Sequence, residues 1–291
     1  MKKVLFLLII NSATGFLLPL SAQNSILWEV SGNGLNEKSY LLGSLKFIGE
    51  KEYVLHPVIE EKLKTCQLFA IEDEVDHHAQ HELNKALHFE KGQSLATAMT
   101  PEDYQKVEDF FSSNFGINKK TFKKSYARLK PLALSITMTR LSLHKELRFY
   151  DIELLKLAKS LRLETYSLEP IDREAQAFNT FAMDEQIAAL MHSVNNFEEQ
   201  KGEYLKLEAA YVNGDIDEIF KYSFHPFENN LNFINEFYQK RNQEWLPKLE
   251  KMFSESKAFV AVGVSHLEGE QGLLSLLRNK GYTLTSIPVK P

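Results

Sequence analysis

The sequence predicts an α/β fold, with a central mixed β-sheet flanked by helices and a large helical section between the N- and C-terminal halves of the sheet. Strand patterns lie at both ends of the 291-residue chain, and the region between them is mostly helical. No low-complexity linker or fixed-period repeat divides the chain. We therefore expect one domain over residues 23–291, in which both ends of the chain contribute to the same sheet.

The C-terminal stretch shows the strand and helix patterns most clearly. Residues 258–262 form an apolar run with β-branched members, which is typical of a strand buried on both faces. An amphipathic helix follows and is expected to end at Gly281, and residues 282–287 alternate as a second strand. His266 lies in the loop just after the first strand, where α/β sheets commonly place ligand sites.

The N-terminal part is expected to open with a β-hairpin of strands 25–31 and 39–45, joined by a turn-rich segment. A helix over residues 57–64 begins at a proline, which is favoured in the first helical turn. Residues 67–71 then form a buried strand, which is followed directly by Glu72.

The middle of the chain shows helical periodicity over long segments. One strand interrupts it at residues 163–168 and ends beside Glu169. The expected helices cover residues 76–89, 101–115, 129–147, 151–161, 172–181, 184–212, 215–222 and 228–253. These helices separate the strands of the N-terminal part from those of the C-terminal part.

The composition argues against a nucleic-acid partner held through phosphate contacts, because the net charge is -5. Hydrophobic residues make up 44% and charged residues 25% of the chain, as in ordinary folded proteins. The only cysteine, Cys66, excludes an internal disulfide. It falls in an apolar-patterned stretch, which predicts a buried and unreactive thiol.

Residues 1–22 have the pattern of a bacterial-type secretory signal peptide. Two lysines precede apolar segments, and Ser21-Ala22-Gln23 resembles a small-residue cleavage site. The alternative is an N-terminal membrane anchor, which the short apolar length disfavours. We therefore expect export to the periplasm or the cell surface, with no stable membrane anchor after the signal is cleaved.

Three polar residues that follow buried strands are the first candidates for a functional site. His266, Glu72 and Glu169 each stand just after a predicted strand, so they could meet at one edge of the sheet. Carboxylate and imidazole groups suit a divalent metal, and a histidine there also suits acid–base chemistry. The alternative is that both glutamates only interact with helix dipoles, and that His266 only binds nearby backbone.

The remaining polar candidates have plainer interpretations. Four histidines lie on or beside one face of a predicted helix: His77, His78, His81 and His88. No His-Glu-x-x-His zinc motif is present, and a solvated polar face explains these histidines better than a metal site. Arg241, next to Asn242, could hold an anion in fork geometry, whereas surface ion pairing is its default interpretation.

The segment Gly43-Ser44-Leu45-Lys46 echoes the segment Gly263-Val264-Ser265-His266. Each has a glycine, two further residues and a basic residue. Each follows a buried strand and precedes a helix–strand unit. The echo indicates that the two segments form corresponding halves of one site.

With these motifs the chain resembles the TraB/GumN family, which is related to the Tiki proteins. The resemblance spans nearly the whole chain after the signal. It rests on residues 27–30, 39–44, 71–74, 168–169, 241–242 and 262–274. The family pattern has two Gly-x-x-His motifs and an acidic residue, which are proposed to form a divalent-metal site, and the Tiki members look like metal-dependent proteases of the cell surface.

The resemblance matches five residues of this chain to recurring positions of the family. His266 matches the histidine of the second Gly-x-x-His motif. Glu72 matches the acid at the strand end, and Glu169 matches a second recurring glutamate. Arg241 and Asn242 match a recurring Arg-Asn pair.

The sequence departs from the family pattern at Lys46, which stands where the first motif has its histidine. A protonated ammonium cannot ligate a metal, so Lys46 argues against a complete site for manganese, cobalt or zinc. We expect Lys46 to pair with Glu72 or Glu169 as a substitute cation. The opposing alternative is a deprotonated Lys46, its pKa lowered by burial, that takes part in different chemistry.

Two functions therefore remain open. The first is an exported metal-dependent hydrolase, in particular a peptidase acting on a peptide or protein substrate. In it Glu72, Glu169 and His266 bind the metal and Arg241 holds the substrate. The second is an inactive family member that binds a peptide or an envelope component without turnover. The lysine at position 46 favours the second function, and the retention of the other residues favours the first.

Overall fold

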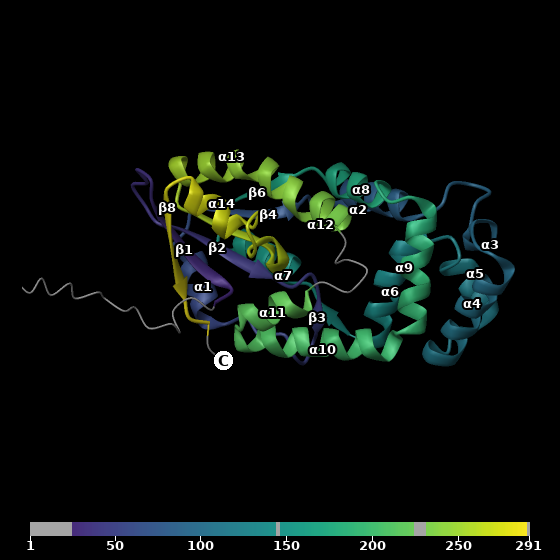
Figure 1. Cartoon of the computed structure of the whole chain (residues 1–291). Helices are drawn as coiled ribbons and strands as arrows, with labels where there is room; N and C mark the ends of the chain where they lie inside the picture. The colour runs from purple at the N-terminus through teal and green to yellow at the C-terminus, as the bar shows by residue number, and fades with distance from the viewer. Residues whose placement is uncertain (1–24, 144–145, 224–230, 290–291) are drawn as a thin grey trace, which may run out of the picture.

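The computed structural model describes residues 25–143, 146–223 and 231–289. Within these ranges the chain forms a six-stranded mixed sheet (Figure 1). In spatial order the strands are β6 (Glu164–Glu169), β4 (Leu68–Asp73), β7 (Ala258–Gly263), β2 (Ser39–Ser44), β1 (Leu27–Gly32) and β8 (Tyr282–Ile287). The predicted α/β fold is confirmed, because both ends of the chain contribute strands to this sheet and helices fill the interval between them.

Four neighbouring strands of the sheet run in the same direction. β6, β4, β7 and β2 are parallel, whereas β1 is antiparallel to both of its neighbours. The register aligns Asp73 with Glu169 and Ser44 with Gly263. Because parallel strands end at one edge of a sheet, the residues at these four C-terminal ends lie together, where open α/β sheets bind their ligands.

Helices cover both faces of the sheet, and alternation along the strands divides the core between them. In β7, Phe259 and Ala261 face one side, and Val260 and Val262 face the other. The first side packs against α1 (Pro57–Lys64), α7 (Tyr150–Ser160), α10 (Phe197–Asn213) and α11 (Ile216–Tyr222). The second side packs against α13 (Lys240–Glu255) and α14 (Leu273–Asn279), as Figure 1 shows. Burial on both faces explains the continuous apolar run of β7.

The helical section lies beyond the C-terminal ends of the parallel strands (Figure 1). It contains α3 (Leu95–Ala98), α4 (Pro101–Phe115), α5 (Lys119–Ser125), α6 (Pro131–Leu143) and α9 (Met183–Asn195). These helices share a core of their own, in which the Phe111 and Phe122 rings lie 4.9 Å apart. α2 (His77–Leu87) and α8 (Ile171–Asn179) follow β4 and β6 and pack against each other.

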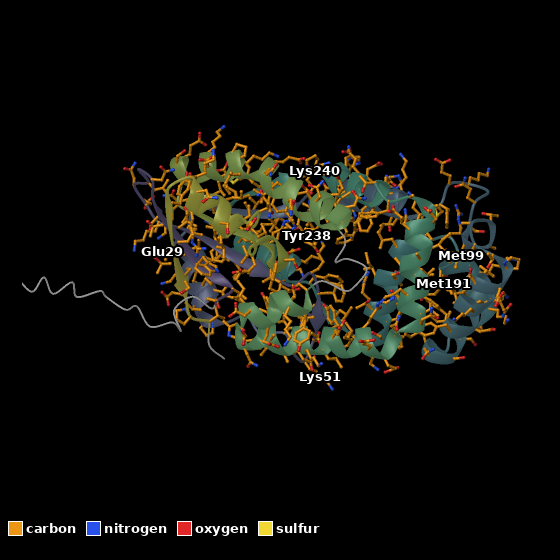
Figure 2. The ribbon with its side chains drawn as sticks, viewed as in Figure 1. Glu29, Lys51, Met99, Met191, Tyr238 and Lys240 are labelled. Carbon is orange, nitrogen blue, oxygen red and sulfur yellow. The ribbon has the colours of Figure 1, made fainter. Side chains whose placement is uncertain are left out.

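The last long helical segment changes its geometry before it reaches the sheet. It begins as α12 (Leu231–Ile234), continues as a π-helix over Asn235–Gln239, and becomes α13. Phe237 in the π-helix is buried, Tyr238 is half-buried, and Lys240, at the start of α13, is exposed (Figure 2). A π-helical turn is rare and is frequently found at functional sites. Here it brings two consecutive aromatic side chains to the inner side of the helix.

Most of the predicted elements are present, and three have the predicted bounds: residues 57–64, 101–115 and 282–287. The prediction of a single helix over 184–212 is wrong, because α9 ends before Asn196 and α10 begins after it. Asn196 Nδ2 donates to the His192 carbonyl at 3.0 Å. The same carbonyl accepts from the Asn196 backbone amide at 2.9 Å, and the helix stops here because the Asn196 backbone, at φ -117° and ψ 29°, leaves the helical conformation.

Other differences involve short elements. The helix predicted over 129–147 is present as α6 (Pro131–Leu143), but Leu147 belongs to the short strand β5 (Leu147–Arg148), which pairs with β3 (Ile48–Gly49). The predicted loop before His266 is a 3-10 turn. Residues 228–230 of the last predicted helix and the predicted signal peptide, 1–22, lie outside the described residues. Among the residues that are described, no helix has the length and apolar character needed to cross a membrane.

Gly43→Ala is expected to destabilise the protein by about 1–3 kcal/mol, as overpacking does. A Cβ at Gly43 would lie 2.7 Å from Leu267 Cδ1 and 3.0 Å from Val264 Cα. The turn that carries His266 would therefore have to move away from β2. The measurement is the free energy of unfolding in urea.

Gly202→Ala is the matched control, because Gly202 lies in α10 and an added Cβ there meets no atom within 4 Å. It is expected to raise the stability by roughly 0.5–1 kcal/mol through the higher helix propensity of alanine. Equal stability of the two variants would contradict the close approach of the turn to Gly43.

Candidate functional site

Polar side chains from four elements converge at the C-terminal edge of the parallel strands. Glu72 and Asp73 end β4, Glu169 ends β6, and His266 ends the 3-10 turn after β7. Arg241 comes from the first turn of α13. All five side chains are buried, and we call them the Arg241 cluster. The structure thus brings together the three strand-end residues that the sequence marked as candidates.

The guanidinium group of Arg241 lies at the centre of the cluster. Its Nη2 is 2.8 Å from Glu169 Oε1, 3.2 Å from Glu72 Oε2 and 3.5 Å from Asp73 Oδ1. Its Nε donates to Glu169 Oε1 at 2.9 Å, and its Nη1 donates to the Phe237 carbonyl at 3.1 Å. The Arg241 side chain is only 4% exposed, so its default interpretation as a surface ion pair is wrong. The surrounding carboxylates must compensate for the loss of water around this charge.

Burial and charge act in opposite directions within the cluster. Burial opposes the charge on Arg241, but Glu72, Glu169 and Asp73 outweigh it and raise the pKa of the guanidinium. Burial raises the pKa of Glu169 to about 7, although Arg241 lowers it. The second oxygen of Glu169 accepts a hydrogen bond from Trp245 Nε1 at 2.7 Å, and the guanidinium lies 4.8 Å from the centre of the Trp245 ring. Both carboxylate oxygens of Glu169 are therefore engaged by the protein.

Asn242 determines the tautomer of His266. Asn242 Nδ2 donates to the carbonyls of His266 and Gln271, so Asn242 Oδ1 is the atom 2.7 Å from His266 Nδ1. Because an amide oxygen only accepts, His266 Nδ1 carries the proton and Nε2 carries the lone pair. Burial and the charge of Arg241 lower the pKa of His266 well below its usual value, so the ring is neutral. His266 Nε2 lies 3.5 Å from Arg241 Nη1 and 3.8 Å from Glu72 Oε1.

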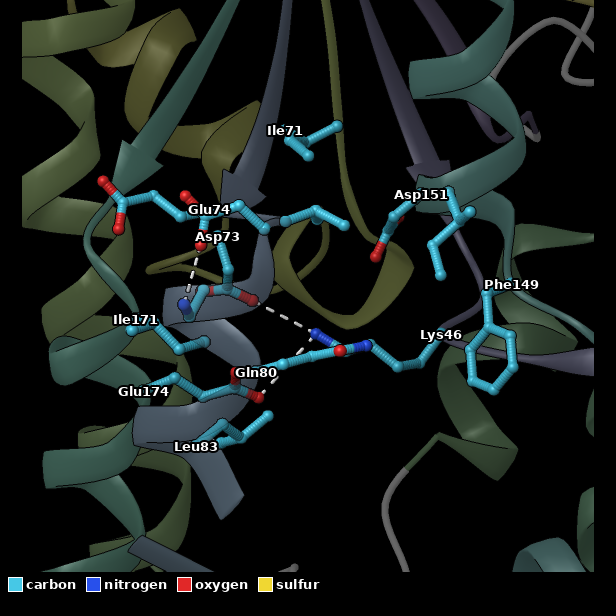
Figure 3. Close-up of a pocket in the computed structure, with 14 residues that line it drawn as sticks. Lys46, Ile71, Asp73, Glu74, Gln80, Leu83, Phe149, Asp151, Ile171 and Glu174 are labelled. Atoms are coloured by element: carbon cyan, nitrogen blue, oxygen red, sulfur yellow. Dashed lines mark hydrogen bonds and ion pairs between the residues drawn. The ribbon is translucent and has the colours of Figure 1, made fainter. Parts of the chain in front are cut away.

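Lys46 has different partners from those predicted. Its ammonium lies 3.1 Å from Asp73 Oδ2 and 3.7 Å from Glu174 Oε1 (Figure 3), whereas Glu72 and Glu169 pair with Arg241. Desolvation opposes the charge, but the carboxylates of Glu174 and Asp73 raise the pKa of Lys46 well above its usual value. Lys46 is therefore a protonated side chain, 53% exposed, and the alternative of a deprotonated lysine is wrong.

Two further carboxylates lie near Lys46. Burial raises the pKa of Glu174 to about 7 and that of Asp151 to about 6, against the influence of the ammonium. Ser44 Oγ donates to Asp151 Oδ1 at 3.0 Å. A small pocket of about 140 Å³ is lined by Lys46, Asp151 and Glu174 (Figure 3). Asp151 and Glu174 therefore gain or lose a proton at pH values near neutral.

A larger cavity of about 450 Å³ adjoins the cluster, and Glu72, Arg241 and His266 contribute to its lining. Most of its wall is apolar and comes from helices. It includes Leu83, Ile136, Phe178, Leu207, Phe237 and Tyr238. Its volume lies in the range of small-molecule sites, which are mostly apolar with a few placed polar groups.

The arrangement does not fit a divalent metal ion. The predicted ligands Glu72, Glu169 and His266 lie together, but the guanidinium of Arg241 already stands where they converge. A metal ion beside this guanidinium would be repelled by it. Among the described residues, no three His, Cys, Asp or Glu side chains are placed so that they could hold a metal ion. Metal ligation by the predicted set would require Arg241 to move away.

The other sequence candidates lie outside the cluster. His77, His78 and His81 are exposed on α2, which agrees with a solvated helix face. Cys66 is buried, and burial raises the pKa of its thiol to about 11. A thiol with a raised pKa is a weak nucleophile, so the prediction of an unreactive cysteine is supported.

Four residues of the site were not predicted as members of it: Asp73, Asp151, Glu174 and Trp245. Asp73 follows Glu72 directly, so the strand-end pattern already contained it. Trp245 lies four positions after Arg241, and residues at this spacing share one helix face. Asp151 and Glu174 have no comparable signal, because they come from separate helices that only the tertiary structure brings to Lys46.

The sequence model of the TraB/PrgY/gumN family matches residues 26–286, and the chain therefore belongs to this family. The match extends from the first strand to the last and includes the whole helical section. Comparisons with curated proteins and with solved structures found no match. Membership of the family does not by itself show a specific activity.

Arg241→Met is expected to destabilise the protein by about 3–5 kcal/mol near neutral pH, because it leaves buried carboxylates without a counter-charge. The loss should become smaller in acid, where protonation removes the repulsion among these carboxylates. The measurement is the free energy of unfolding in urea, for parent and variant, once near neutral pH and once in acid.

Arg173→Met is the matched control for this experiment. The Arg173 side chain is 16% exposed, and it makes a bidentate pair with Glu244, 49% exposed, through Nε at 2.8 Å and Nη2 at 3.1 Å. Because Glu244 keeps its contact with water when the partner is removed, loss of this pair is expected to cost about 1 kcal/mol. If the two variants lost the same stability, the central role of Arg241 would be wrong.

The contribution of Glu174 to the stability of the protein is expected to fall as the pH rises. Its folded pKa of about 7 exceeds the ordinary value of 4.5, so the folded state binds the proton more tightly than the unfolded chain does. This contribution is complete below pH 4.5 and is lost as the pH rises through 7. Glu174→Gln removes the titration, so its stability relative to the parent should rise across this window and stay constant above it.

Asp151→Asn provides the comparison, with unfolding measured over the same pH series. The pKa of Asp151 rises from 3.8 to about 6, so the relative stability of its variant should level off at a lower pH. Differences that do not depend on pH for either variant would show that burial beside Lys46 does not raise these pKa values.

Proposed function

We propose that this protein is an exported family member that binds a ligand in the cavity beside the Arg241 cluster and does not use a resident metal to turn it over. The ligand is a peptide segment or an envelope component. The observation that carries the proposal is the guanidinium group held 2.8–3.5 Å from three carboxylates. The signal-peptide pattern of residues 1–22 supports export to the periplasm or the cell surface.

The state of the carboxylates supports binding over metal-dependent hydrolysis. Metal catalysis needs ligands with free lone pairs and an open coordination position. Glu169 accepts hydrogen bonds at both oxygens, and Glu72 accepts from Arg241 and from the Gly263 amide. Lys46, in place of the histidine of the family pattern, adds a second cation to the same group of carboxylates.

Hydrolysis is a second candidate function, and His266 is the observation that favours it. The ring is neutral, its Nε2 carries a lone pair that faces Arg241 Nη1 at 3.5 Å, and Asn242 holds its orientation. His266 also contributes to the lining of the cavity. This is the state that a general base requires, and Arg241 would then be the group that holds the substrate.

The purified mature protein is expected not to bind Mn²⁺, Co²⁺ or Zn²⁺ stoichiometrically, as measured by isothermal titration calorimetry. Lys46→His is expected to gain binding, because it removes a cation and supplies an imidazole ligand. Lys51→His is the matched control, since it adds a histidine at an exposed position outside the cavity (Figure 2).

Two outcomes would decide against this proposal. Stoichiometric metal binding by the parent that disappears in His266→Ala would show that the Arg241 cluster opens to a metal. Cleavage of a peptide library by the parent, abolished by the same substitution, would favour the hydrolase. Exposed histidines of α2 can bind metal adventitiously, so the titrations are repeated with His77 and His81 replaced by alanine.

A further inference from the structure

One cation at the large cavity stands apart from the Arg241 cluster. Arg140, on α6, lines the cavity and is exposed. In the described part of the chain no carboxylate lies within ion-pair distance of its guanidinium, which lies over the Phe149 ring at 5.4 Å from the ring centroid. Lys46 and Arg241, by contrast, are both paired with carboxylates.

Arg140 thus differs from the other two cations of the lining. Lys46 is paired with Asp73 and Glu174, and Arg241 is paired with Glu72, Asp73 and Glu169. His266 is neutral because of its lowered pKa. The guanidinium of Arg140 is therefore the positive group of the lining that a ligand can meet, and an anionic group is complementary to it.

Apolar surface surrounds this cation. Ile136 lies four residues before Arg140 on the same face of α6, lines the cavity, and is 37% exposed. Phe233, Phe237 and Tyr238 line the cavity from α12 and the π-helix, and the rings of the two phenylalanines stack with centroids 4.4 Å apart. Phe233 and Phe237 are only 5% and 8% exposed, so a ligand gains mainly by covering Ile136 and the half-buried Leu83, Leu87 and Phe149 of the same lining.

We propose that the cavity binds an acyl chain that ends in a carboxylate, with the chain against the apolar wall and the carboxylate paired with Arg140. The proposal rests on the proposed function, because it takes the same cavity as the ligand site. A guanidinium matches a carboxylate through two parallel hydrogen bonds. The volume of about 450 Å³ suits a small, mainly apolar molecule.

The test compares three probes with one eight-carbon chain, octanoate, octanol and octylamine, by isothermal titration calorimetry near neutral pH. Octanoate is expected to bind one site per chain and octylamine about tenfold more weakly or not at all. Arg140→Gln should weaken octanoate binding about tenfold and leave octanol binding unchanged. Arg128→Gln, an exposed arginine that does not line the cavity, is the matched control and should bind octanoate as the parent does.

Several results would overturn the assignment. Undiminished octanoate binding by Arg140→Gln would exclude the arginine as the anchor. Equal binding of all three probes, or binding of none, would exclude a carboxylate-ended chain as the ligand. Binding of the dipeptide acetyl-Leu-Phe, but not of octanoate, would assign the cavity to peptide C-termini instead. Stoichiometric metal binding by the parent would overturn the proposed function alone, because it does not involve Arg140.

Discussion

The candidate site depends on one desolvated cation. Arg241 is almost completely buried, and it is stable there because Glu169 and Glu72 accept its hydrogen bonds and Asp73 adds a third negative charge. These carboxylates end two adjacent parallel strands, and the arginine belongs to a helix more than seventy positions along the chain from the nearer of them. The ion pairs therefore tie α13 to the C-terminal edge of the sheet. They also determine which groups in the site remain free for chemistry.

The remaining protonation states follow from this cation. His266 is neutral because it is buried beside Arg241. Its Nε2 faces the guanidinium of Arg241 at 3.5 Å as well as the carboxylate of Glu72 at 3.8 Å. Asp73 links the two positive centres, since its Oδ1 lies near Arg241 and its Oδ2 binds Lys46. Burial near Lys46 leaves Glu174 with a raised pKa. The site thus holds two compensated cations, with the carboxylates shared between them.

The strand-end residues could be predicted from the sequence because strand patterns are local. A buried run such as 258–262 indicates where the strand stops, and parallel strands stop at one edge, so Glu72, Glu169 and His266 were expected to meet. The echo between the segments of Lys46 and His266 was also informative, since β2 and β7 are neighbours in the sheet.

The ion-pair partners of Arg241 and Lys46 and the helix break at Asn196 could not be predicted from the sequence. Periodicity predicts a helix around Arg241 but does not say that this residue points into the sheet edge. Lys46 takes Glu174 as a partner from a helix that no local pattern connects to β2. The break at Asn196 is a change in the backbone conformation of one residue within a segment that otherwise has uniform helical periodicity.

The lysine at position 46 opposes metal binding in two ways. A divalent ion could replace Arg241 only if its own bonds to Glu169 and Glu72 compensated for the hydrogen bonds that these carboxylates now accept from the guanidinium. Breaking a buried pair of this kind typically costs about 3–5 kcal/mol. With Lys46 present, the incoming ion would also meet a second cation, 3.1 Å from Asp73. The same lysine supplies no lone pair with which to bind the ion. A histidine at this position would remove the repulsion and provide a ligand together, but the guanidinium of Arg241 would still stand where Glu72, Glu169 and His266 converge. Residue 46 and Arg241 therefore both act against a metal ion at this edge of the sheet.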